Sequence, residues 1–316
     1  MSETKTEWYF IVNPRAGSGK TMSQWVPAEK LLEQKGIPFV TAMTDHKKHA
    51  EELAREAAAA GYRRIAAVGG DGSLHEVFGG ICSWCSEAGV PPEEFRLAVV
   101  PIGSGNDWIK SCGVPDSVDE VIRLIAQESF GRMDIVRAVS RDGVVSYMAN
   151  CAGTGFDSHV CDRVNHQKER GMRGAMIYLN ALRYTIFHLK PISVMVRADG
   201  QEVFSGEVYS IATGNGPWSG GGMRQVPLAR NDDGQLDYMI VPKAPLRKLV
   251  REVPRLFSGT AHESELILSG RCATLQIAPL DETSADLIEF DGEIEGRLPL
   301  EISITGHTLN VLKGSR

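Results

Sequence analysis

Three glycine-rich segments each follow a short apolar run, and their residue types suit the binding of phosphate. The segments are NPRAGSGK at 13–20, GGDGS at 69–73 and GSGND at 103–107. Glycine lets a backbone approach a phosphate closely and present its N–H groups, and a helix that follows adds its positive end. A single loop of this kind is common at turns. Three together, with hydroxyl and carboxylate side chains among the glycines, predict a nucleotide site.

Asp71 is the most informative residue of these loops. A carboxylate among phosphate-binding glycines would repel the nucleotide unless a cation lies between them, and Mg²⁺ suits carboxylate and phosphate oxygens together. We therefore expect Asp71 to engage Mg²⁺. The alternative is that Asp71 caps a helix expected to begin near Leu74.

Two familiar nucleotide-binding loops do not fit these segments. Lys20 and Thr21 resemble the end of a Walker A loop, but Pro14 stands where the first glycine of that loop is required. None of the segments fits GxGxxG, so a dinucleotide-binding fingerprint is also excluded.

The elements that must position these loops alternate between strand and helix. Strands are expected at 8–12, 37–42, 65–68 and 97–100, and helices near 28–35 and 48–60. This alternation predicts a parallel sheet with helices on both faces. Ligands of such sheets bind at the carboxyl ends of the strands, where the glycines fall.

From about residue 133 the pattern changes to short runs of β-branched and aromatic residues. Strands are expected at 144–149, 193–198, 207–213, 236–241, 274–278 and 300–304, with helical interruptions at 163–189 and 246–257. We expect a nucleotide-binding α/β domain at 1–132 and a β-rich second domain at 133–305. The tail at 306–316 is a candidate to pack back on the first domain.

Composition excludes some classes of function. The chain has 34 basic and 40 acidic residues and a net charge of -6, which argues against a general nucleic-acid binder. The N-terminus has no signal-peptide pattern, and no apolar run reaches about 18 residues, so we expect a cytoplasmic protein that touches membranes only peripherally. Cys82 and Cys85 form the one CxxC pair, inside a helix-like run, and are interpreted as helix-packing residues.

These segments resemble the diacylglycerol kinase catalytic-domain family, which also contains sphingosine and ceramide kinases and soluble bacterial lipid kinases. The three glycine-rich loops occur in the order and spacing of that family. Further matches are G-x-G-F-D at 153–157, D-G-x-L-D at 233–237 and D-G-E at 291–293. The resemblance implies an α/β N-terminal domain with a parallel sheet, of the NAD kinase and diacylglycerol kinase type, and a mostly antiparallel β second domain.

The resemblance also implies which residues contact the nucleotide. They are Asn13, Pro14, Gly17, Thr44, Gly69, Gly70, Asp71, Gly72, Ser73, Glu76, Gly103, Ser104, Asn106 and Asp107. Serine stands at 73 and 104 where threonine is usual in the family, and either residue supplies the hydroxyl.

Catalytic and metal-binding roles are implied in the same way. Asp71, Asp291 and Glu293 form the catalytic set, with Asp291 or Glu293 as the base for the acceptor hydroxyl. A hairpin turn is the alternative interpretation of the Asp-Gly pair. A structural Mg²⁺ is implied at Asp233 and the carbonyls of Arg230 and Gln235, although NDDG is a strong turn signal with or without metal.

The implied activity is ATP- and Mg²⁺-dependent phosphorylation of a lipid hydroxyl, with diacylglycerol converted to phosphatidic acid. Both substrates are expected in a cleft between the domains. The stretch 163–190 is basic and apolar, which suits either contact with a membrane surface or a helix that covers a sheet. An edge strand could pair two copies into a homodimer.

Three rival functions remain at this stage. A sphingoid-base kinase would need the same phosphate-handling residues, and an NAD kinase shares a GGDG loop and a similar two-domain plan. A nucleotide-binding regulator without catalysis would be expected to lack an acidic residue, yet Asp71, Asp291 and Glu293 are all present.

Overall fold

The computed structural model describes residues 4–103, 106–141, 143–170, 172, 175–188 and 190–314. Two compact units divide the chain. Unit 1 comprises Met1–Ile135 and Gly306–Arg316, and unit 2 comprises Val136–Thr305. Each unit is described by itself below.

Unit 1 is built on a parallel sheet with the order β2-β1-β3-β4-β15. The strands are β1 (Lys5–Val12), β2 (Phe39–Met43), β3 (Tyr62–Gly69), β4 (Arg96–Pro101) and the end of β15 (Leu300–Leu312). The central strands β3 and β4 are almost entirely buried, as expected for a parallel sheet that is covered on both faces. The four strands expected in this region are confirmed.

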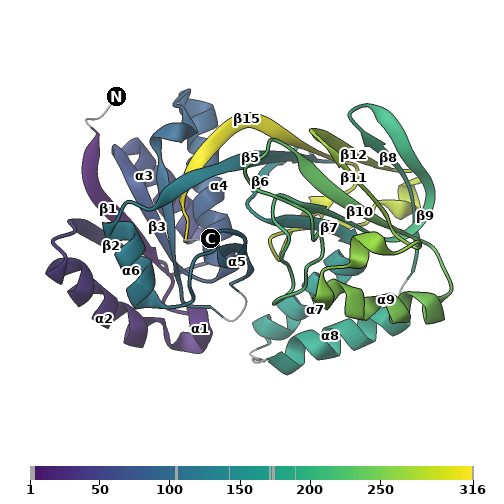
Figure 1. Ribbon diagram of the computed structural model, residues 1–316, viewed down its shortest axis with the longest axis horizontal. Coiled ribbons are helices and arrows are strands. Elements are labelled where there is room, and N and C mark those ends of the chain that lie inside the picture. Colours follow the sequence, from purple (N-terminus) through teal and green to yellow (C-terminus); the bar gives the residue numbers. More distant parts are fainter. Residues whose placement is uncertain are drawn as a thin grey trace. The chain divides into compact units, whose positions relative to one another are not determined.

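Helices cover both faces of this sheet (Figure 1). They are α1 (Ala16–Gly19), α2 (Thr21–Gln34), α3 (His49–Ala59), α4 (Asp71–Ala88), the 3₁₀ turn η1 (Pro92–Glu94), α5 (Asp107–Ser111) and α6 (Val118–Ala126). β2 and β3 pair with opposite edges of β1, so the connections through α2 and α3 run in opposite directions. Since parallel crossovers are right-handed, these helices lie on opposite faces. The carboxyl ends of β1 and β3 flank the resulting switch point, where such sheets bind ligands.

Helix α4 contains both cysteines of the CxxC pair. Cys82 and Cys85 are buried, and burial raises the pKa of both thiols, that of Cys85 to about 12. Such thiols stay protonated and unreactive near neutral pH. Their interpretation as helix-packing residues is confirmed.

Unit 2 is antiparallel throughout its described strand pairs. One path of paired strands runs β14-β13-β7-β9-β8-β12-β15, while β10 joins β9 to β11 and β6 pairs with β5. The strands are β5 (Phe130–Ser140), β6 (Val145–Met148), β7 (Cys151–Gly155), β8 (Ile192–Ala198), β9 (Gln201–Gly214), β10 (Leu236–Pro242), β11 (Leu268–Cys272), β12 (Thr274–Pro279), β13 (Leu287–Phe290) and β14 (Glu293–Arg297). Inward-facing aliphatic residues of these strands form one buried core.

The helices of unit 2 differ in part from expectation. They are α7 (Phe156–Glu169), α8 (Ala175–His188), α9 (Leu246–Ser258) and the 3₁₀ turns η2 (Ala261–Glu263) and η3 (Glu282–Ser284). The single helical interruption expected at 163–189 is two helices, α7 and α8. Helix α7 begins earlier than expected, at Phe156, because β7 ends directly before it at Gly155, which has a φ of 78°. Among the described residues, no helix is long and apolar enough to cross a membrane.

The contact between α3 and α4 makes a testable prediction at Gly80. A methyl group on Gly80 would lie 2.5 Å from the carbonyl oxygen of Glu51 and 2.9 Å from Cβ of Ala54. Gly80→Ala should therefore lower the free energy of unfolding by about 1–3 kcal/mol, as overpacking does. At Gly79 such a methyl would point into open space, so Gly79→Ala should stabilise the helix by up to about 1 kcal/mol. Equal effects of the two substitutions in urea unfolding would contradict this packing.

Candidate functional site

The three glycine-rich loops of unit 1 meet at the carboxyl ends of β1, β3 and β4. Asn13 Nδ2 donates a hydrogen bond of 3.2 Å to Ser73 Oγ, which joins the first loop to the second. A methyl group on Gly103 would lie 2.6 Å from Cα of Gly70, so these two backbones touch. A methyl group on Gly17, which has a φ of 54°, would lie 3.2 Å from Ile102 Cγ2. The structure thus brings together loops that are far apart in the sequence.

Asp71 ties the second loop to the third. Its Oδ2 accepts a hydrogen bond from the backbone N–H of Asp107 at 3.0 Å, and its Oδ1 accepts one from Trp108 at 3.2 Å. Those N–H groups open α5, so the carboxylate caps that helix. The helix expected near Leu74 is α4, which begins at Asp71 itself with Gly70 as N-cap residue and no side-chain cap. The alternative that Asp71 caps the helix near Leu74 is therefore wrong, since its carboxylate caps α5 instead.

The described part of the third loop is held by side-chain contacts. Asn106 has a φ of 41°, and its Nδ2 donates to Asp116 Oδ1 at 2.8 Å. Asp107 is buried, and its Oδ1 lies 2.7 Å from Lys110 Nζ. Ser104, which was expected to contact the nucleotide, lies outside the described residues.

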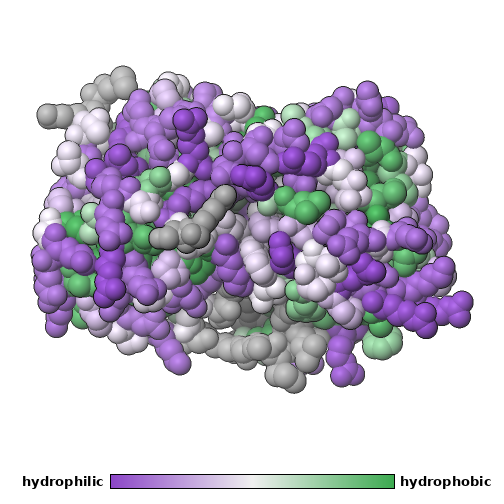
Figure 2. Space-filling model, viewed as in Figure 1, coloured by the Kyte–Doolittle hydropathy of each residue, from purple (hydrophilic) through white to green (hydrophobic). Residues whose placement is uncertain are grey.

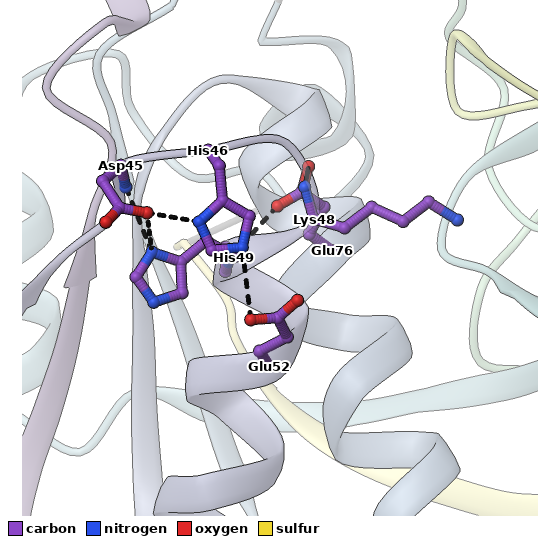
Figure 3. Close-up of polar contacts among 7 residues, drawn as sticks. Asp45, His46, Lys48, His49, Glu52 and Glu76 are labelled. Atoms are coloured by element: carbon purple, nitrogen blue, oxygen red, sulfur yellow. Dashed lines mark hydrogen bonds and ion pairs between the residues drawn. The ribbon is translucent and has the colours of Figure 1, made fainter.

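Thr44 and Glu76 lie beside the first two loops in different ways. The backbone N–H of Thr44 donates to the carbonyl of Val12 at 2.9 Å, which holds Thr44 next to the start of the first loop. Glu76 accepts hydrogen bonds from the backbone N–H groups of Lys48 and Ala50, both at 3.1 Å, at the start of α3 (Figure 3). The observed contacts of Glu76 therefore position α3, and its contact with a nucleotide remains a prediction.

An exposed cluster of ionisable residues follows Thr44 (Figure 3). His46 lies between Asp45 and Glu52, and hydrogen bonding to Asp45 raises the pKa of the imidazole and lowers that of the Asp45 carboxyl. His46 and His49 stack with ring centroids 4.3 Å apart and planes 14° apart. Nitrogen lone pairs of nearly parallel rings do not converge on one point, which a shared metal ion would require. We interpret the cluster as an ion-pair network at the start of α3.

In unit 2, Asp291 and Gly292 form the turn of the β13–β14 hairpin. Both residues have positive φ, 51° and 88°, as a two-residue type I′ turn requires. The Asp291 carboxylate accepts three backbone hydrogen bonds, from Ala149 at 2.9 Å, Asn150 at 2.8 Å and Cys151 at 3.0 Å. The hairpin interpretation of the Asp-Gly pair is therefore correct, and Asp291 fastens the hairpin to the connection between β6 and β7.

Two further acidic residues of this hairpin, Glu289 and Glu293, have separate positions. Glu289 is buried in β13, and its Oε2 accepts the backbone N–H of Gly292 at 2.9 Å. Glu293 opens β14 opposite Phe290 and is partly exposed. Of the two candidate bases, Asp291 is thus the one whose carboxylate accepts hydrogen bonds from backbone N–H groups.

The turn expected to hold a structural metal has a positively charged side chain beside it, that of Arg271. Asp233 Oδ1 accepts the backbone N–H of Gln235 at 3.3 Å, and its Oδ2 is paired with the guanidinium of Arg271. Nε of Arg271 also lies 3.3 Å from Asp237 Oδ2. The Arg230 guanidinium turns instead toward Asp232, at 3.4 Å. A magnesium ion at Asp233 would compete with Arg271 for the same carboxylate.

Unit 2 also contains an apolar cavity of about 140 Å³. Residues of β9, β10, α8 and α9 line it, together with Phe156 and Asp157 at the start of α7. Asp157 accepts hydrogen bonds from the side chains of Ser210 and Gln225, and burial raises the pKa of its carboxyl to about 6. A methyl group on Gly153 would lie 2.9 Å from Cβ of Asp157, which explains the glycine in this motif. Sequence reasoning noted the motif but did not assign Asp157 to a site.

Family comparisons agree with both halves of this description. A model of the diacylglycerol kinase catalytic domain matches residues 7–138, and a model of the YegS C-terminal NAD kinase β-sandwich-like domain matches residues 150–313, more than half of the chain. The chain belongs to the family of diacylglycerol kinase-type lipid kinases. The fold class expected from the sequence is confirmed, and the protein is a phosphotransferase of the lipid kinase type.

Individual relatives of the kinase match over most of its length. A diacylglycerol kinase of Mycobacterium tuberculosis is 27% identical over 304 residues, which cover 96% of this chain and 94% of that protein. A protein of Xanthomonas euvesicatoria pv. vesicatoria named "Probable lipid kinase YegS-like" is 30% identical over 238 residues, 75% of this chain and 74% of its own. A crystal structure of a diacylglycerol kinase from Bacillus anthracis is similar with a TM-score of 0.71 and 21% identity, over 98% of this chain and 97% of that one, and supports the fold.

The raised pKa of Asp157 predicts how the stability of the kinase depends on pH. The folded carboxyl has a pKa of about 6 instead of 3.8, so the folded state holds this proton more tightly than the unfolded state. Its contribution to stability is full below the ordinary pKa and is lost as pH rises toward 6. The loss is at most about 3 kcal/mol, since one pKa unit corresponds to about 1.4 kcal/mol.

Asp157→Asn should remove this dependence. Unfolding midpoints of wild type and variant, measured from acidic to neutral pH, should diverge across that window and stay constant above it. Glu282→Gln, at an exposed carboxyl, is the matched control. A constant difference between wild type and Asp157→Asn across the window would show that the carboxyl titrates normally.

Proposed function

We propose that the kinase transfers the γ-phosphate of ATP to the free hydroxyl of diacylglycerol and produces phosphatidic acid. The observation that carries the proposal is the apolar cavity of unit 2, which has the chemistry of an acyl-chain site and a polar carboxyl in its wall. An enzyme for a soluble acceptor such as NAD has no need of such a lining. The name of the mycobacterial relative supports the choice of acceptor.

On the nucleotide side, the converging loops of unit 1 would hold the phosphates through backbone N–H groups. The Asp71 carboxylate would hold Mg²⁺ against the phosphate oxygens, and the ion, when bound, supplies neutralisation of their charge. Asp71 suits this role because the N–H groups of Asp107 and Trp108 fix its orientation. Phosphoryl transfer depends mainly on such positioning and charge neutralisation.

On the acceptor side, we assign the base to Glu293. The Asp291 carboxylate accepts hydrogen bonds from three backbone N–H groups, whereas Glu293 lies directly after the same turn and is partly exposed. The Glu293 carboxylate would take the proton of the lipid hydroxyl while the hydroxyl oxygen attacks the γ-phosphorus and ADP leaves. Asp291 would act by holding the hairpin that carries Glu293.

A sphingoid-base kinase is the second candidate, and one observation favours it. With a pKa of about 6, Asp157 is mostly ionised at neutral pH, and its carboxylate would suit the ammonium group of a sphingoid base. Diacylglycerol has no charged group to match it. The two acceptors therefore predict different effects of Asp157→Asn, which should weaken use of a sphingoid base far more than use of diacylglycerol.

The acceptor can be identified by transfer of labelled γ-phosphate from ATP and Mg²⁺ to diacylglycerol, sphingosine, ceramide and NAD, with the lipids in mixed micelles. We expect labelled phosphatidic acid, and a loss of at least about 100-fold in rate for Asp71→Asn and Glu293→Gln. Labelled sphingoid phosphate would keep the mechanism and change the acceptor. Labelled NADP, or no transfer to any acceptor by folded protein, would reject the proposal.

The assignment of the base separates the two carboxylates of the hairpin. Asp291→Ala should lower the free energy of unfolding by at least about 2 kcal/mol, because three backbone donors lose a charged acceptor. Glu293→Gln should abolish transfer yet change stability by less than about 1 kcal/mol. Thermal unfolding and transfer rates should be measured on the same samples. An active Glu293→Gln variant would move the base elsewhere.

A further inference from the structure

Helix α9 carries an apolar stripe that unit 2 leaves partly exposed. Its apolar residues recur with helical spacing and are Leu246, Leu249, Val250, Val253, Leu256 and Phe257. Within the described structure, no residue of α9 is buried. Leu246, Val250 and Phe257 are 39%, 49% and 58% exposed, and their spacings of four and seven residues align them along one line of the helix. Packing against the rest of unit 2 therefore accounts for only part of this amphipathic pattern.

The opposite side of α9 is basic. It carries Arg247, Lys248, Arg251 and Arg255 against a single acid, Glu252. Arg255 is paired with Glu252 at 3.0 Å and with Glu263 at 3.7 Å. The other three cations are exposed and have no ion-pair partner in the part of the chain that the structure describes. Figure 2 shows hydrophilic side chains projecting from the region of α9 in the view of Figure 1.

The same helix forms a wall of the apolar cavity. Leu249, Val253 and Leu256, which are partly buried, line the cavity together with the exposed residues of the stripe. Helix α8, which also borders the cavity through Leu182 and Ile186, exposes the aromatic ring of Phe187 to 75%. Exposed apolar surface is thus continuous with the lining of the cavity.

We propose that α9 lies in the surface of an anionic lipid bilayer, with its stripe among the acyl chains and Arg247, Lys248 and Arg251 against the lipid phosphates. A helix with one apolar and one cationic face has the chemistry of such an interface, and each cation strengthens the attraction to an anionic surface. The inference rests on the proposed function in one respect, since the acceptor would pass from the bilayer past α9 into the cavity. A second copy of the chain is a poorer occupant, because a symmetric contact through the stripe would leave the cations on the opposite side of α9 without anionic partners.

Vesicle sedimentation tests the surface directly. Phosphatidylcholine vesicles with and without phosphatidylglycerol would be used as the probe. We expect the charge variant R247Q/K248Q/R251Q to lower partitioning onto the anionic vesicles about 10- to 100-fold and to remove its salt dependence. The apolar variant V250S/F257S should lower partitioning onto both kinds of vesicle by about tenfold or more.

Matched controls lie on α2 of unit 1 and at its C-cap residue, Lys35. Lys30→Gln with Lys35→Gln removes exposed charge, and Val26→Ser removes an apolar side chain that is 45% exposed. Neither control should change partitioning. Wild-type partitioning by both α9 variants would overturn the proposal, as would an effect of the controls equal to that of the variants. A dimer that V250S/F257S dissociates, with vesicle binding unchanged, would identify the stripe as a protein interface and would also overturn it.

Phosphate transfer to a dispersed short-chain diacylglycerol separates this inference from the proposed function. The charge variant should keep its wild-type rate on this acceptor and lose activity only on vesicles that contain long-chain diacylglycerol. Equal rates of variant and wild type on those vesicles would overturn the role of α9. Absence of transfer by wild type to any acceptor would reject the proposed function, while vesicle binding that depends on α9 would still support the membrane surface.

Discussion

The arrangement of the glycine-rich loops of unit 1 depends on backbone-to-backbone contact between Gly70 and Gly103. A methyl group at Gly103 would come within 2.6 Å of the Gly70 Cα, so the loops after β3 and β4 can meet only without side chains at this point. Their contact brings the N-terminus of α5 within reach of Asp71, whose carboxylate then accepts two N–H groups of the neighbouring loop. The parallel sheet delivers three loops to one edge, and the glycines allow them to close on each other.

Acidic residues in both units act first as acceptors for backbone N–H groups. Asp71 and Glu76 hold the starts of α5 and α3, and Asp291 and Glu289 hold the hairpin turn and its neighbouring connection. Carboxylates used in this way stabilise loops that have little apolar surface of their own to bury. Acidic residues therefore serve both the fold and the proposed catalysis. A substitution at an acidic position must be tested for folding as well as for the rate of transfer.

Much of this organisation is predictable from the sequence because glycine loops, hydroxyls and alternating strands leave local patterns. Four strands of the parallel sheet and the fold class were predicted in this way, and the family was predicted from the resemblance of its motifs. Contacts between distant segments leave no such pattern: neither the pairing of Arg271 with Asp233 nor the cavity around Asp157 could be predicted, because each depends on side chains from separate strands and helices. The start of α7 was missed because residues 153–157 were interpreted only as a motif.

Strand β15 has a consequence for the order of folding during synthesis. Its last residues pair with β4, and Asn310 Nδ2 donates to the carbonyl oxygen of Glu93 at 2.6 Å, so they complete one edge of the unit 1 sheet. The ribosome makes these residues only after the whole of unit 2. Until then β4 has an unpaired edge, open to another nascent chain or a chaperone. Unit 1 is thus the first unit to emerge from the ribosome and the last to be completed. Completion of its sheet requires that both units have been translated.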